Sequence, residues 1–422
     1  MDNKIKLYTD ELKIGMYVSE LDRAWIDTPF LFQGFLISQH EELEQLQKHC
    51  DFVFVDRELS RPEVSPLLKV SSLRRHPPKN GAKRVPPGHK RFTEADFRHS
   101  LVSSFRVYRD ARGWIDTMLE DSRLGNSVDT HTARGLVTRL AEEVIQNADA
   151  LVWLTHLKKR DQYTATHCIN VCILALTFGR SLGLDGETLN RLGLGALLHD
   201  IGKLRVPERI LNKPGRLTES EFNIMMTHPQ EGHALLANDH SLELDTLNII
   251  LHHHERLDGR GYPFGLAEHE ISLLVRITSI VDVYDAITSD RCYHDAIPPA
   301  RALENLFKWA PGNYDVGLLE SFIKCIGIYP IGSVVRLVSN EVGVVVASDQ
   351  GRRLKPIVML VKNSEGKPYA ARRFVNLSSA IWERNGVPLS INEVLEPRAH
   401  GIDVKALLQE ELHASDIQLA SA

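Results

Sequence analysis

The sequence lacks long apolar runs, and this lack excludes a membrane-spanning helix. No stretch of its 422 residues approaches the roughly 20 consecutive apolar residues that cross a bilayer. The first residues lead directly into charged ones, without the apolar core of a signal peptide. We therefore expect a cytoplasmic protein with no membrane span.

The sequence is also poor in cysteine. Its five cysteines show no dense or paired pattern, although Cys168 and Cys172 lie one helical turn apart on an apolar segment. Buried reduced thiols explain this arrangement better than a disulfide or a zinc site does. This usage indicates a reducing compartment.

An excess of basic residues is absent as well. The net charge of -5, with 43% hydrophobic and 25% charged residues, is that of an ordinary soluble protein and gives no reason to expect a DNA-binding surface. An anionic substrate stays open, because a buried metal supplies its own positive charge. The length predicts two or three domains.

The residue pattern divides the chain into five parts. A small α+β domain is expected over 1–60, with strand-like runs at 16–21 and 52–55 and a helix over 38–49, which Ser38 and Glu41 would cap. A basic, proline-rich linker follows over 61–91.

Apolar positions at helical spacing then recur up to about residue 325. We expect connecting helices over 92–150 and a catalytic helical domain over 151–325. Short valine-rich runs at 333–338, 343–347 and 356–361 predict a small β appendage within 326–422, with a helical tail from Asp403. The fold class is therefore mainly α.

Residue types that bind metals are concentrated in the helical part. The pairs and runs are His199-Asp200, His252-His253-His254 and Asp282, each next to apolar helix-like sequence. Nitrogen and carboxylate ligands on several helices indicate a metal centre in a helical core, and hence a hydrolytic metalloenzyme. Lys203, near such a centre, would neutralise charge on a phosphoryl group; alternatively, it is a surface lysine at a helix end.

Several assignments stay open on the residues alone. His167 and His228 could be core histidines rather than ligands. Three consecutive imidazoles on a helix cannot converge on one point, and the sequence does not say which two do. Asp282 and Asp285 share a helix face, so that one would ligate while the other caps or pairs.

In this order, the motifs resemble the HD-GYP family of phosphohydrolases, a subgroup of the HD superfamily. The matching stretch runs from about residue 163 to 294 and includes the HDIGK motif at 199–203, HHE at 253–255 and DGRGYP at 258–263. The N-terminal segment, with GMYV at 15–18, resembles a domain of unknown function often found ahead of HD-GYP modules.

The resemblance implies an all-helical core that holds two or three metal ions, usually iron or manganese. The implied metal ligands are His167, His199, Asp200, His228, His253, His254 and Asp282, with Asp200 bridging the ions and His252 left out. The resemblance further implies a catalytic role for Asp200 and Lys203, and substrate contacts from Lys203, Gly261, Tyr262, Arg291 and His294.

Two departures from the family pattern carry consequences. Members with three metals have a glutamate four residues before the first ligand histidine, and Tyr163 stands there, which predicts two divalent ions. Cys292 and His294 replace a common proline and a basic residue, which affects nucleotide affinity and base choice.

The predicted function is hydrolysis of cyclic di-GMP to linear pGpG or GMP, through a hydroxide shared by two metals. The same chemistry on cyclic GMP-AMP or a phosphomonoester is one alternative, and a non-catalytic nucleotide-sensing scaffold is another. GGDEF-type signalling proteins, through the GYP loop, and a second copy of the chain are further partner hypotheses.

Overall fold

The computed structural model describes residues 4–22, 35–57, 59–61, 64, 93–124, 126–157, 163–290, 296–348, 355–379, 383–384 and 387–420. These residues form two compact units, one ending at residue 64 and the other beginning at residue 93. Most of the predicted linker lies outside the described residues. In the described part, none of the helices combines the length and apolar character needed to cross a bilayer.

The first unit is an antiparallel sheet covered by one helix. The elements are β1 (Lys4–Tyr8), η1 (Thr9–Glu11), β2 (Tyr17–Leu21), β3 (Phe35–Leu36), α1 (His40–His49) and β4 (Phe52–Asp56), and the strand order is β1-β4-β2-β3. Alternation along β4 buries Val53 and Val55, which pack in one core with Leu46 of α1.

The helix predicted from Ser38 begins two residues later, and Glu41 is not its capping partner. Gln39 is extended, with φ -132° and ψ 158°, so that the first turn starts at His40. Glu42 closes this turn by accepting from the backbone N–H groups of Ser38 (2.6 Å) and Gln39 (3.0 Å). The capping-box prediction was wrong by one residue, because it placed the end of the extended segment too early.

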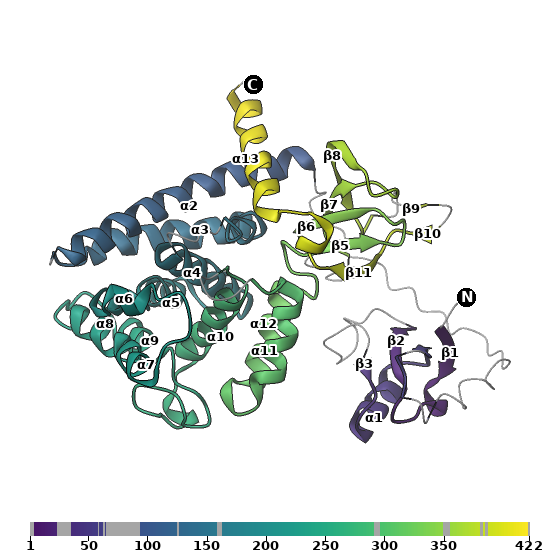
Figure 1. Ribbon diagram of the computed structural model, residues 1–422, viewed down its shortest axis with the longest axis horizontal. Coiled ribbons are helices and arrows are strands. Elements are labelled where there is room, and N and C mark those ends of the chain that lie inside the picture. Colours follow the sequence, from purple (N-terminus) through teal and green to yellow (C-terminus); the bar gives the residue numbers. More distant parts are fainter. Residues whose placement is uncertain are drawn as a thin grey trace. The chain divides into compact units, whose positions relative to one another are not determined.

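The second unit has a helical core. Its helices are α2 (Glu94–Arg123), α3 (Thr130–Leu154), α4 (Tyr163–Ser181), α5 (Gly186–Leu198), η5 (Ile201–Arg205), α6 (Glu208–Leu211), α7 (Glu219–Met225), α8 (His228–Leu236), α9 (Leu244–His252), η6 (Glu268–Glu270), α10 (Leu273–Ile287), α11 (Pro299–Asn313) and α12 (Val316–Ile326). α4 is central: it contacts α2, α3, α5, α10 and α12 (Figure 1). Its residues 165–176 are all buried, as expected for a helix surrounded by others.

A five-stranded antiparallel sheet follows the helices. It consists of β5 (Val334–Leu337), β6 (Val342–Ala347), β7 (Ile357–Lys362), β8 (Pro368–Asn376) and β11 (Ile391–Leu395), in the order β11-β5-β6-β7-β8. β9 (Glu383–Arg384) and β10 (Val387–Pro388) form a separate pair, and η7 (Arg398–His400) precedes α13 (Val404–Ala420), which packs against α2 (Figure 1). The predicted fold class, mainly α with small sheets near both ends, is confirmed.

Candidate metal centre

The predicted ligands come from the ends of three helices and the interiors of two others. His199 and Asp200 follow the last residue of α5, His253 and His254 follow the last residue of α9, and His228 begins α8. His167 and Asp282 lie inside α4 and α10. At a helix end the chain leaves the helical path, so neighbouring side chains can turn toward one point.

These seven side chains form two groups. In one group, ligand atoms of Asp200, His228, His253 and His254 all lie within 4.8 Å of one another; in the other, those of His167, His199 and Asp282 do so. His254 is half-buried and the other six side chains are buried. The structure thus brings together every residue that the sequence predicted as a ligand.

Asp200 lies between the two groups. Its Oδ1 is 3.3 Å from Nε2 of His228, whereas its Oδ2 is 3.4 Å from Nε2 of His199 and 3.7 Å from Nε2 of His167. One carboxylate therefore presents one oxygen to each group.

Outward hydrogen bonds orient the histidine rings. Nδ1 of His199 donates to the backbone carbonyl of Ala196 (2.7 Å). Nδ1 of His228 donates to the backbone carbonyl of Met225 (2.8 Å). Nδ1 of His253 likewise donates to the carbonyl of Ile250 (3.0 Å). Since Nδ1 carries the proton in each ring, Nε2 is left as the ligand atom that faces the centre.

Asp285 supports His167 from outside the centre. Its carboxylate contacts Nδ1 of His167 at 2.7 Å, while Nε2 of His167 lies 3.0 Å from Asp282. Asn170 donates to Asp285 (3.1 Å) and to the Thr155 carbonyl (3.0 Å). Sequence analysis did not single out Asn170, although its position three residues after His167, on the same face of α4, was a usable signal.

The protonation states suit cation binding. Burial, with smaller contributions from neighbouring histidines, holds the pKa values of His253 and His254 well below their usual range. Burial would raise the pKa values of Asp200 and Asp282. Lys203 and the neighbouring histidines together outweigh burial at Asp200, and His167 together with other neighbouring histidines does so at Asp282, so both pKa values fall well below the usual range. Neutral imidazoles and ionised carboxylates are the forms that bind metals.

The donor set fits divalent cations. Nε2 of His199 and Oδ1 of Asp200 are buried without a hydrogen bond of normal geometry among the described residues. Burial acts to lower the pKa of His167, but Asp282 and Asp285 raise it overall. His167 therefore favours a proton on the side of Asp282, where the two side chains would otherwise share a cation. Ligation of a metal ion would give these buried nitrogen and oxygen atoms the partner that they lack among the described residues.

Lys203 and the GYP loop border the centre. Nζ of Lys203 donates to Oδ2 of Asp200 at 2.6 Å. The GYP loop, residues 258–267, is closed by a bridge between Asp258 and Ala267. The Tyr262 ring lies 4.6 Å from the His254 ring, and the exposed Phe222 of α7 lies 6.4 Å from Tyr262. Sequence analysis missed Phe222, because nothing in its local pattern shows that α7 approaches this loop.

Comparison with known proteins identifies the family. Residues 145–318 match the HD domain, and residues 4–133 match a domain of unknown function, DUF3391. A cyclic di-GMP phosphodiesterase of Pseudomonas aeruginosa is 36% identical over 374 residues, which cover 88% of each chain. The chain belongs to the HD-GYP family. The family resemblance inferred from the sequence is thereby confirmed.

Other relatives match a shorter part of the chain. A cyclic di-GMP phosphodiesterase response regulator of Xanthomonas campestris is 35% identical over 170 residues, 40% of this chain and 45% of the relative. A 3'3'-cGAMP-specific phosphodiesterase of Vibrio cholerae is 36% identical over 148 residues, 34% of this chain and 31% of the relative.

The remaining predicted residues of the HD-GYP site have different outcomes. Gly261 lies beside the backbone of Glu255 and Arg256, where a Cβ atom would overlap both residues. His252, which was excluded as a ligand, contacts the Phe264 ring at a centroid distance of 5.8 Å. Arg291 and His294 lie outside the described residues.

Proposed function

We propose that the chain is a metal-dependent phosphodiesterase that hydrolyses cyclic di-GMP to linear pGpG, GMP or both. The observation that carries this proposal is the pair of ligand groups that share Asp200. Five helices, or the residues directly after their ends, supply the seven side chains, so segments far apart in the sequence meet at this centre. The relatives named above as cyclic di-GMP phosphodiesterases support the choice of substrate.

Two divalent ions, iron or manganese, are the proposed cofactors. Asp200, His228, His253 and His254 would hold one ion, and His167, His199 and Asp282 the other, with Asp200 shared. When bound, such ions act as Lewis acids toward a phosphodiester and lower the pKa of water. Tyr163 offers no carboxylate at the first position of α4, which supports two ions rather than three.

The residues beside the ligands would bind and orient the substrate. Lys203 would move from Asp200 to a non-bridging phosphoryl oxygen and stabilise the negative charge that develops there. Asp200, ionised at neutral pH, would bind both cations and keep them next to each other. Gly261 and Tyr262 would shape the substrate side of the loop, and Arg291 and His294 remain predicted contacts to a base.

A cyclic GMP-AMP substrate is the second candidate. The similarity to a 3'3'-cGAMP-specific enzyme favours it, as does the departure from the family pattern at Cys292 and His294. The intact set of seven ligand side chains argues against a purely non-catalytic scaffold.

We also propose that the chain divides into domains at residues 60, 91, 150 and 325, with the N-terminal domain as a sensory unit. GGDEF-type partners and a homodimer also remain proposals.

Turnover by metal-loaded protein tests the proposal. Anaerobically purified protein is loaded with Fe(II) or Mn(II), and cyclic di-GMP and cyclic GMP-AMP are followed by chromatography in parallel. We expect turnover, and a loss of at least about 100-fold in His199→Ala together with a fall in bound metal, because a ligand contributes more than an outer contact.

His252→Ala is the matched control in the same assay. His252 lies beside two ligands but packs on Phe264, so activity should stay within about twofold of wild type. No turnover with either metal, or full turnover by His199→Ala, would contradict the proposed activity. Faster turnover of cyclic GMP-AMP would favour the second candidate.

A further inference from the structure

The GYP loop is attached to the residue that follows the two ligand histidines of α9. Glu255 is 2% exposed, and its two carboxylate oxygens are used separately. Oε1 accepts from the backbone N–H of Phe264 at 2.8 Å, and Oε2 accepts from that of Leu266 at 3.0 Å. Both hydrogen bonds span the loop, because their donors lie nine and eleven residues farther along the chain.

We propose that Glu255 is a positioning residue, which holds the GYP loop over the metal centre so that Tyr262 meets the substrate. The proposal rests on the phosphodiesterase function proposed above. Among the described residues, the hydrogen-bond partners of the carboxylate belong to the loop, so the side chain acts through the loop and not on the ligand atoms.

Backbone contacts strengthen this attachment. The N–H of Tyr262 donates to the carbonyl of His254 at 3.3 Å. The Cα of Gly261 lies so close to the backbone of Glu255 that no side chain fits between them. Segment 254–255 thus contacts the loop at residues 261, 262, 264 and 266, and a shift of the loop would disturb the Tyr262–His254 ring contact.

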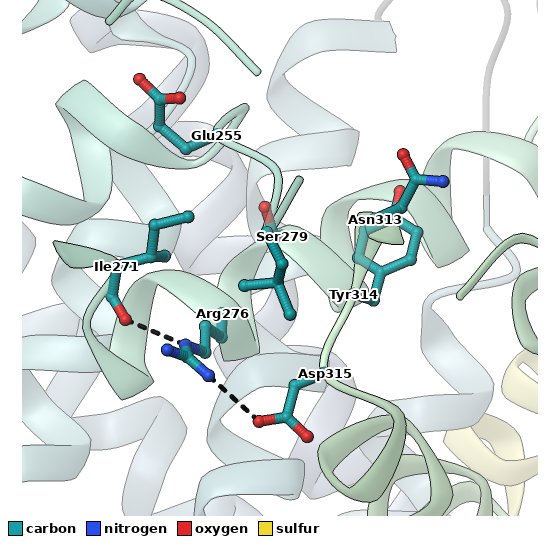
Figure 2. A pocket seen from close by; sticks show the side chains of 8 residues that line it. Glu255, Ile271, Arg276, Ser279, Asn313, Tyr314 and Asp315 are labelled. Atoms are coloured by element: carbon teal, nitrogen blue, oxygen red, sulfur yellow. Dashed lines mark hydrogen bonds and ion pairs between the residues drawn. The ribbon is translucent and has the colours of Figure 1, made fainter. Parts of the chain in front are cut away.

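A second anchor holds the segment that directly follows the loop (Figure 2). Arg276, on α10, donates through Nε to the carbonyl of Ile271 (2.9 Å) and through its terminal nitrogens to the carbonyl of Glu268 (2.5 Å) and to Asp315 (3.2 Å). Glu255 and Arg276 line the same small pocket, about 210 Å³ with the adjoining open solvent included. Because Glu255 holds the loop itself and Arg276 holds the segment after it, the loop needs little ordering when a substrate binds, which lowers the entropic cost of binding.

The wall of this pocket also touches the ligand segment. Ser279, between the two anchors in Figure 2, donates to the carbonyl of His253 and accepts from Arg256 at 3.2 Å. Arg276 and Ser279 of α10 therefore support the segment after the loop and the segment of a ligand histidine, respectively.

The test compares two phosphodiesters in variants of Glu255. Cyclic di-GMP would contact the loop through Tyr262, whereas bis(4-nitrophenyl) phosphate, a small diester, reports on the metal centre. For Glu255→Ala we expect kcat/KM on cyclic di-GMP to fall about 10- to 100-fold, mainly through KM, with the small diester within about twofold and metal content unchanged. Glu255→Gln, which keeps one accepting oxygen, should lose less.

Glu270→Gln is the matched control. Glu270 also accepts a loop N–H, from Ala267 at 2.8 Å, but it is exposed, so its substitution should leave both rates unchanged. Amide hydrogen exchange measures the anchor directly: the N–H groups of Phe264 and Leu266 should exchange faster in both Glu255 variants than in Glu270→Gln.

Two results would overturn the proposal. Equal losses on both diesters with reduced metal content would place Glu255 in the support of the metal centre, and unchanged exchange at Phe264 and Leu266 would show that the loop is held by other contacts. If the wild-type protein cleaves the small diester but not cyclic di-GMP, the proposed substrate fails, while the exchange measurement still decides the role of Glu255. If Glu255→Ala does not fold, Glu255→Gln provides the same comparison.

Discussion

At the scale of single residues, the protonation of the centre is determined by what surrounds each group. His253 and His254 lose the tendency to bind a proton because they are buried beside other imidazoles. Asp200 is buried too, yet Lys203 at 2.6 Å and the neighbouring histidines together hold its pKa well below the usual range and keep it ionised. Neutral and anionic ligands are therefore ready at neutral pH, without competition from protons at these three residues.

Lys203 gives the prediction at this scale. Lys203→Met should lower kcat on cyclic di-GMP by about 10²- to 10³-fold and leave metal content near the wild-type value, because the lost charge would act on the phosphoryl group. Arg205→Met, exposed on the same short helix η5, is the control and should behave as wild type. Metal content that falls in step with kcat would instead show that Lys203 mainly holds Asp200.

At the scale of elements, close backbone contact brings two ligand segments together. η5, which follows Asp200, crosses α8, which begins with His228, at a pair of glycines. A Cβ atom on Gly202 would overlap the carbonyl oxygen of His228, and one on Gly232 would lie 3.1 Å from the Gly202 nitrogen. Glycine is needed there because the two backbones touch.

Two glycine-to-alanine substitutions should therefore have opposite effects. Gly202→Ala should destabilise the protein by about 1–3 kcal/mol or more through overpacking. Gly113, exposed within α2 with open space within 4 Å of where a Cβ atom would lie, should tolerate alanine and gain about 0.5–1 kcal/mol. Denaturant unfolding measures both free energies, and equal stabilities of the two variants would contradict the close contact.

At the scale of the whole second unit, α3 connects the helical core to the C-terminal sheet. The carboxylate of Asp149 accepts from the backbone N–H and the hydroxyl of Ser348, both at 3.0 Å, just after β6. Near the end of α3, His156 contacts the carbonyl of Ile331 at 2.9 Å. α13 returns to pack along α2 (Figure 1). These contacts attach the sheet to the helices on the side of α3.

The Asp149 contact predicts a pH dependence of stability. Burial raises the pKa of Asp149 to about 6, although the Ser348 hydrogen bonds act to lower it. The unfolded chain, with the ordinary pKa of 3.8, releases this proton first, so the wild-type protein loses stability as the pH rises from about 4 to 6.

Asp149→Asn removes this titration. Its melting temperature relative to wild type should be higher at pH 7.5 than at pH 4.5, by an amount that corresponds to roughly 1–2 kcal/mol for a half-buried carboxylate. Thermal melts of metal-free protein at both pH values measure the difference. A difference that does not vary with pH would contradict the raised pKa.

The helical region and several strands could be predicted from the sequence, because their signal is local. The helical spacing predicted helices up to about residue 325, and α12 ends at Ile326; the valine-rich runs located β5–β7 to within a residue or two of their ends. β8 and β11 were missed, since β8 is an edge strand with a largely polar, exposed sequence and has no apolar alternation. Boundaries such as the start of α1 depend on backbone geometry that the sequence pattern does not specify.

The sequence by itself determined the family, the mainly helical fold and the identity of the residues near the centre. Motif order and residue type carry this information even without coordinates. Only the tertiary structure decided how these residues meet. α9 ends at His252, so His253 and His254 turn inward while His252 packs on Phe264, and Asp282 and Asp285 take opposite nitrogens of His167. These outcomes depend on where helices end and cross, which is set by packing between segments far apart in the chain.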